Sequence, residues 1–64
     1  MKQELRKNPM ITIKYCRSYG EWQEALNTIV MLIDSKKEHF NSVYGNNHYF
    51  AKVTNGGNII VERV

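Results

Sequence analysis

The sequence has one cysteine, one proline and no long apolar run. Cys16 cannot form a disulfide within the chain, which excludes a disulfide-stapled secreted scaffold. No stretch approaches the roughly 20 apolar residues of a membrane-spanning helix. The N-terminal stretch MKQELRKNP is charged throughout and lacks the apolar segment of a signal peptide. These absences predict a cytoplasmic protein without a membrane segment.

The sequence also lacks a strong excess of charge of one sign. The formal net charge of +3 argues against mimicry of DNA, which requires dense negative charge, and it permits contact with phosphates or with an acidic protein. With 42% apolar and 23% charged residues, the composition is that of a globular protein. A chain of 64 residues has room for one domain with a thin core, which a second chain would help to complete.

Motifs for catalysis, metal binding or phosphate binding are missing. The soft metal ligands Cys16, His39 and His48 lie too far apart in the sequence for a zinc motif, and we expect His39 at the helix C-terminus and His48 at a loop-to-strand junction. The NGGN stretch lacks the Gly spacing and the following Lys of a phosphate-binding loop. Asp34 and Glu38 lie among lysines and are typical of a solvated helix face. We therefore predict no enzymatic activity, no cofactor and no metal site.

Hydrophobic patterning divides the chain into a charged arm and one small domain. Met10 to Cys16 alternate as a half-buried strand does, and Ser18 with Glu21 has the spacing of a helix capping box. We predict a flexible arm over residues 1–9 and a single domain over residues 10–64, which holds a strand at 10–16, a helix at 19–38, a loop at 41–47 and strands at 48–54 and 58–64.

The register of the last two strands follows from the apolar residues. A turn with an odd number of residues around Gly56 and Gly57 pairs Val53 with Ile59, and it keeps the other apolar residues together. The most apolar strand should be central. The predicted fold is therefore α+β with element order β-α-β-β, a three-stranded antiparallel sheet of order 1-3-2, and one helix packed on one face.

The helix and the sheet each have a predicted outer surface. Helical spacing places Trp22, Leu26, Ile29 and Ile33 against the sheet, and Thr28 and Met31 away from it. Strand alternation places Thr12, Lys14 and Cys16, together with Phe50 and Ile60, on the sheet face that the helix does not cover. Because apolar residues on an uncovered face suggest association, the candidate partner-binding residues are Lys14, Met31, His48, Phe50, Lys52 and Ile60.

These surfaces favour a non-enzymatic protein-binding module that acts by occlusion or as an adaptor. In architecture, a β-α-β-β domain of this size without a catalytic site resembles small phage-encoded inhibitors that grip host enzymes or defence complexes. That resemblance implies a protein partner, although no diagnostic motif of such proteins occurs. The apolar outer positions also predict a homo-oligomer, and a homodimeric structural accessory protein is one alternative function.

Nucleic acid is the other alternative partner. Aromatic residues interleave with basic ones in the last third of the chain, and an open sheet that displays aromatics can stack RNA bases. The residues concerned are Tyr44, His48, Tyr49, Phe50 and Lys52. Glu62 lies on the same predicted face and argues against phosphate binding, as does the modest net charge.

Overall fold

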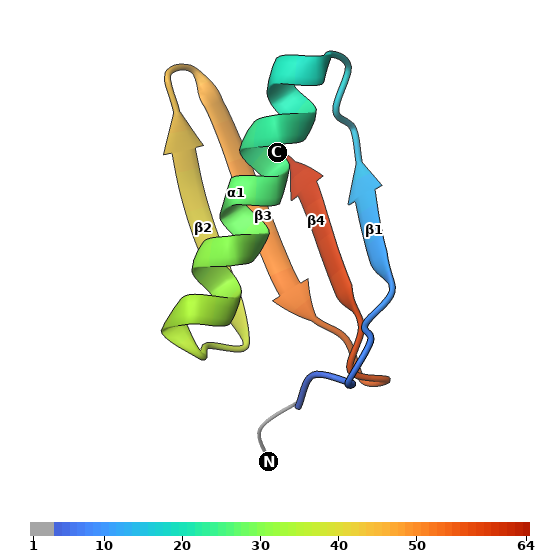
Figure 1. The fold of residues 1–64 in the computed structure, drawn as a ribbon. Coiled ribbons are helices and arrows are strands. Elements are labelled where there is room, and N and C mark those ends of the chain that lie inside the picture. Colours follow the sequence, from blue (N-terminus) through green and yellow to red (C-terminus); the bar gives the residue numbers. More distant parts are fainter. Residues whose placement is uncertain (1–3) are drawn as a thin grey trace.

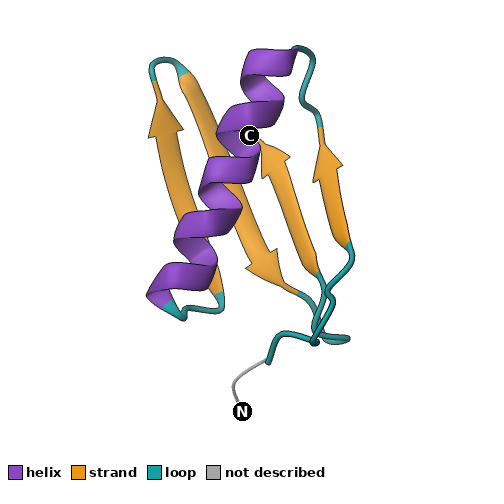
Figure 2. Cartoon of the chain, viewed as in Figure 1, coloured by secondary structure: helices purple, strands orange, loops and turns teal. Residues whose placement is uncertain are grey.

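The computed structural model describes residues 4–64, which form an α+β domain of two layers, one helix packed on one face of a four-stranded sheet (Figures 1 and 2). The elements are β1 (Ile11–Lys14), α1 (Tyr19–Ser35), β2 (His39–Tyr44), β3 (Asn47–Val53) and β4 (Ile59–Arg63). This confirms the predicted α+β class with a single helix. Within the described range, α1 is too short and too polar to cross a membrane.

The sheet order is β1-β4-β3-β2, so the predicted three-stranded sheet is wrong in its strand count. The predicted neighbours are correct: the C-terminal strand lies between the first strand and the strand at residues 47–53. The predicted antiparallel direction of the first strand is wrong, because β1 and β4 run parallel. The reason is the additional strand β2, which reverses the chain once more between α1 and β4.

Residues 39–44 form a strand at the sheet edge, whereas the sequence prediction placed the helix end and a loop there. β2 pairs antiparallel with β3, and Tyr44 lies opposite Asn47 across a two-residue turn. Gly45 has φ +60, which suits the first central position of a II′ hairpin turn. The Gly45-Asn46 pair is itself a hairpin signal. Phe40 and Tyr44 pack against the core, and Ser42 lies between them, so alternate residues of β2 share the inner face.

The hairpin between β3 and β4 has the predicted register. Val53 lies opposite Ile59 and Ala51 opposite Val61, and the three loop residues 55–57 lie between Thr54 and Asn58. Thr54 closes this loop by donating its N–H to the Asn58 carbonyl at 2.8 Å. Gly57 has φ +81, the left-handed conformation expected for a loop of this length.

The core lies between α1 and the inner face of the sheet. The inward residues of β3 and β4 are buried, whereas Ile11 and Tyr15, on the predicted inner side of the first strand, are exposed. The buried strand residues form one cluster with the helix: Ala25, Ile29, Leu32, Tyr49, Ala51, Val53, Ile59 and Val61. On the helix, the predicted orientation is wrong in part. Trp22 and Ile33 are 41% and 43% exposed, whereas Thr28 is fully buried.

The helix is rotated from the predicted orientation because small side chains face the sheet. Ala25 and Thr28 allow the helix backbone to approach the strands closely. The Thr28 hydroxyl donates to the Glu24 carbonyl at 2.9 Å, so its burial leaves no unsatisfied polar group. A count of large apolar residues alone therefore misjudged which side of the helix packs on the sheet.

The predicted helix start is confirmed, and the predicted end at residue 38 is wrong. Ser18 is the N-cap, and its hydroxyl accepts from the Glu21 N–H at 3.1 Å. Glu21 reaches back to the Arg17 N–H at 2.8 Å. The helix stops at Ser35 because Lys36 adopts the left-handed conformation, with its N–H bonded to the Ile33 carbonyl.

Replacement of Ser18 by alanine should lower the free energy of unfolding by about 1 kcal/mol, since the first turn loses its side-chain acceptor. Urea denaturation measures the loss. Ser35→Ala is the matched control, because that hydroxyl bonds the Leu32 carbonyl at the other end of the helix. Equal and negligible losses of unfolding free energy in both variants would contradict the role of Ser18 as the N-cap.

The described part of the predicted arm, residues 4–9, lies against the β3–β4 loop. The Arg6 N–H donates to the Gly57 carbonyl at 2.9 Å. The Met10 N–H donates to the Asn58 side chain at 3.0 Å and leads the chain into β1. Lys2 and the rest of residues 1–3 lie outside the described residues, and the flexibility of the arm stays a prediction.

Candidate functional site

The sheet face opposite α1, here called the open face, carries most of the candidate residues. Strand alternation and the observed register place ten side chains there: Thr12, Lys14, His39, Asn41, Val43, His48, Phe50, Lys52, Ile60 and Glu62. Five of the six predicted partner-binding residues are therefore brought together on one surface. They come from β1, β3 and β4, and the neighbouring positions of β2 complete the face.

A shallow hollow of about 150 Å³ lies at the middle of the open face. It is lined by Lys14, Phe50, Lys52, Ile60 and Glu62. Glu62 lies opposite Phe50 on one side and opposite Lys14 on the other, so charges of both signs stand beside an aromatic ring. Phe50 and Ile60 are half-buried, and the apolar floor of the hollow is therefore partly accessible to a ligand.

His39 belongs to this site, although the sequence placed it at the helix terminus. Its ring stacks on Phe50, with 6.0 Å between the ring centroids and 29° between the ring planes. The two residues are diagonal neighbours, because His39 lies opposite Lys52 and Phe50 opposite Asn41. Recognition of β2 as a strand would have been enough to find His39.

Met31 is the predicted partner-binding residue that the structure places elsewhere. It lies on the outer side of α1 and is 44% exposed. The sheet separates it from the hollow, because α1 packs on the other sheet face (Figure 1). A single flat partner surface cannot contact both Met31 and Phe50.

Cys16 lies on the helix side of the sheet, so its predicted place on the open face is wrong. Tyr15 adopts the left-handed conformation at φ +65, which ends the alternation of β1 and turns Cys16 toward the core. Its thiol donates to the Glu21 carbonyl at 3.8 Å. Burial raises the pKa of the Cys16 thiol, and Glu21 raises it further, which disfavours the nucleophilic thiolate.

Cys16 and His48 therefore lie on opposite sides of the sheet, which rules out direct contact between them. No group of His, Cys, Asp and Glu side chains within residues 4–64 is arranged to hold a metal ion.

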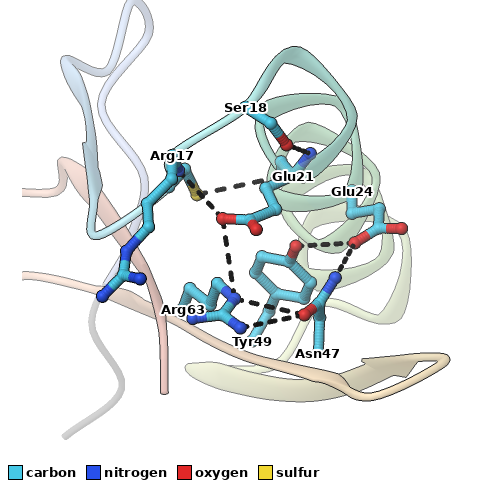
Figure 3. A network of polar contacts seen from close by, with 8 residues as sticks. Arg17, Ser18, Glu21, Glu24, Asn47, Tyr49 and Arg63 are labelled. Atoms are coloured by element: carbon cyan, nitrogen blue, oxygen red, sulfur yellow. Dashed lines mark hydrogen bonds and ion pairs between the residues drawn. The ribbon is translucent and has the colours of Figure 1, made fainter.

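Polar side chains connect the first turns of α1 to the ends of β3 and β4 (Figure 3). Glu24 accepts from the Tyr49 hydroxyl at 2.6 Å and from the Asn47 side chain at 3.1 Å. Arg63 donates twice to Asn47, at 3.0 and 3.2 Å, and lies 3.6 Å from Glu21. These contacts hold the helix on the sheet, and they occupy both carboxylates with structural partners.

Tyr49→Phe should make the protein less stable at neutral pH, by about 1–3 kcal/mol for a hydrogen bond to a carboxylate. The difference in the free energy of unfolding between the wild-type protein and Tyr49→Phe should shrink above pH 10. Burial raises the pKa of the Tyr49 hydroxyl, and the hydrogen bond to Glu24 raises it further. The folded state then keeps a proton that the unfolded chain loses near pH 10, so this contribution to stability is present below pH 10 and falls as the pH rises.

Urea denaturation between pH 7 and pH 11 measures this effect. Tyr19→Phe is the control, because Tyr19 is 73% exposed. A difference between the wild-type protein and Tyr49→Phe that stays constant above pH 10 would contradict the raised pKa.

Comparison of the chain with protein-family models, with curated proteins and with solved structures gives no match.

Proposed function

We propose that the protein is a non-enzymatic protein-binding module whose open face docks on a partner protein. The observation that carries this proposal is the central hollow, in which Phe50 lies between lysines and a carboxylate. Aromatic residues are enriched at the centres of protein interfaces, and polar or charged residues are typical of the rim around such an anchor. By covering the surface to which it binds, such a module inhibits by occlusion, in the manner of the phage-encoded inhibitors, or serves as an adaptor.

The placement of the aromatic residues supports a protein partner over nucleic acid. Tyr49 is 1% exposed and Tyr44 packs against the core, so neither can stack a base on the open face. Of the ten residues of the open face, Phe50 is the one phenylalanine, tyrosine or tryptophan. Glu62 is its direct neighbour and would repel a phosphate chain.

Two measurements test the class of partner. Fluorescence anisotropy with labelled single-stranded RNA and DNA at 150 mM salt should show no nanomolar binding. Affinity capture from a lysate of the source cells should recover a protein whose retention survives nuclease treatment and is lost with Phe50→Ala. Nanomolar, salt-sensitive binding to RNA or DNA would overturn the proposal in favour of a nucleic-acid-binding module.

A further inference from the structure

The helix covers the sheet unevenly. In Figure 1, α1 begins near the top of β1 and crosses the sheet diagonally to end in front of β2. It packs over β2, β3 and β4 and hardly contacts β1. As a result Ile11, which faces the helix side of the sheet, is 45% exposed, and Ile13 is half-buried.

The side of α1 that faces β1 is apolar and exposed. Tyr19 and Trp22, at the start of the helix, lie beside Ile13 of β1, and they are 73% and 41% exposed. Tyr19 and Trp22 stack with 5.9 Å between their ring centroids. Together with Ile13 they line an open hollow of about 450 Å³. Tyr19 and Trp22 with Ile11 and Ile13 are called the β1–α1 surface below.

The outer edge of β1 carries backbone groups free to pair. The Met10 carbonyl accepts from the Ile59 N–H at 2.9 Å, so Met10 directs its backbone groups toward β4. Because successive residues of a strand direct these groups to alternate sides, Ile11 and Ile13 direct theirs away from the sheet. Within residues 4–64, β1 has β4 as its one strand neighbour. The other edge strand, β2, differs because α1 covers its inner face.

We propose that β1 pairs antiparallel with β1 of a second copy, with the two-fold axis at Thr12. This register places Ile11 opposite Ile13 of the second copy and Thr12 opposite its own equivalent. The outward backbone groups of Ile11 and Ile13 then bond across the axis, while the two Thr12 side chains form the closer, non-hydrogen-bonded pair. The two sheets join into one, and the two open faces become continuous.

Self-pairing fits the side chains of β1. An antiparallel strand must place residues of the same sheet face opposite one another, and centring the pair at Thr12 does so. The register keeps the two Lys14 side chains about 13 Å apart along the strand, which avoids a like-charged pair. Isoleucine and threonine pairs are favourable cross-strand neighbours.

The size of the surface also fits a second copy. The exposed parts of the β1–α1 surface amount to roughly 400 Å² per chain, so a dimer that covered them would bury roughly 800 Å² of side chain besides the paired backbone, which is within the range of weak, transient interfaces. In the proposed register, Ile11 of the second copy lies beside Ile13, at the mouth of the hollow that Tyr19 and Trp22 line. Pairing of the edges therefore covers apolar side chains that each copy leaves exposed.

Cross-linking at the axis tests both the dimer and its register. In a Cys16→Ser background, Thr12→Cys places two thiols opposite each other, at a Cα separation suited to a disulfide. Glutathione disulfide accepts the two electrons and two protons that the thiols lose when the bond forms. We expect a covalent dimer at micromolar protein on a non-reducing gel. Lys14→Cys in the same background is the matched control, because its two thiols lie beyond reach of each other.

Efficient cross-linking of Lys14→Cys together with absence of cross-linking at position 12 would overturn the register, and absence at both would overturn the pairing. Sedimentation equilibrium of the unsubstituted protein should then show a dimer that Thr12→Lys converts to a monomer, since like charges would face each other across the axis. Asn41→Lys, on the opposite sheet edge, should remain a dimer. A wild-type protein that is monomeric up to 500 μM would overturn the proposal.

Discussion

Replacement of Leu32 by alanine should destabilise the domain by about 2–5 kcal/mol, whereas Ile33→Ala should cost less than about 1 kcal/mol. Leu32 is 1% exposed and packs in the cluster between the helix and the sheet. Its truncation leaves a cavity between the helix and the sheet. Ile33 is the next residue of the same helix, and it is 43% exposed.

This pair of variants tests the orientation of α1 directly, because the two residues are adjacent in the helix, have the same size and point in different directions. Thermal or urea denaturation followed by far-ultraviolet circular dichroism measures both losses. If Ile33→Ala destabilised the domain as much as Leu32→Ala or more, the helix would pack on the sheet in the orientation predicted from the sequence, with Ile33 buried.

Gly57→Ala should also destabilise the domain, with a loss of about 1–2 kcal/mol for the left-handed backbone alone and a further loss from steric overlap. Gly57 has φ +81, and a Cβ built there would lie 2.7 Å from the Glu4 carbonyl oxygen and 2.9 Å from the Arg6 nitrogen. Since these are backbone atoms, the N-terminal segment must move away. The hydrogen bond from Arg6 to Gly57 should then be lost with it.

Gly56→Ala is the matched control in the same loop. A Cβ there meets the Asn58 side chain at 3.4 Å, an ordinary contact, and no left-handed conformation is required. Hydrogen exchange of the Arg6 amide should accelerate in Gly57→Ala and stay unchanged in Gly56→Ala. Unchanged exchange and stability in Gly57→Ala would contradict the close approach of the two segments.

The sequence predicted correctly those features that depend on residues close together in the chain. Ser18 with Glu21 located the start of the helix, because a cap is made by residues three apart. The odd loop between Val53 and Ile59 followed from matching apolar residues across one turn. The same alternation placed Phe50 and Lys52 on the open face, so the main part of the candidate site could be predicted.

The wrong predictions concern features that depend on contacts between residues distant in the sequence. Residues 39–44 mix polar and aromatic side chains, and they become a strand by pairing with β3, so their composition looked like that of a loop. Thr28 could be recognised as buried only once its hydroxyl partner and the closeness of the sheet were known. His39 was not predicted to belong to the site because no strand was predicted at residues 39–44.

We propose that a partner protein docks on the open face and that Phe50 is its main contact. Isothermal titration calorimetry with the captured partner should show at least a tenfold weaker affinity for Phe50→Ala, as expected when an aromatic anchor worth about 1.4 kcal/mol or more is truncated. Met31→Ala, on the far side of the molecule, should bind as the wild-type protein does, and circular dichroism should show both variants folded. An unchanged affinity for Phe50→Ala, or an equal loss for Met31→Ala, would contradict the claim.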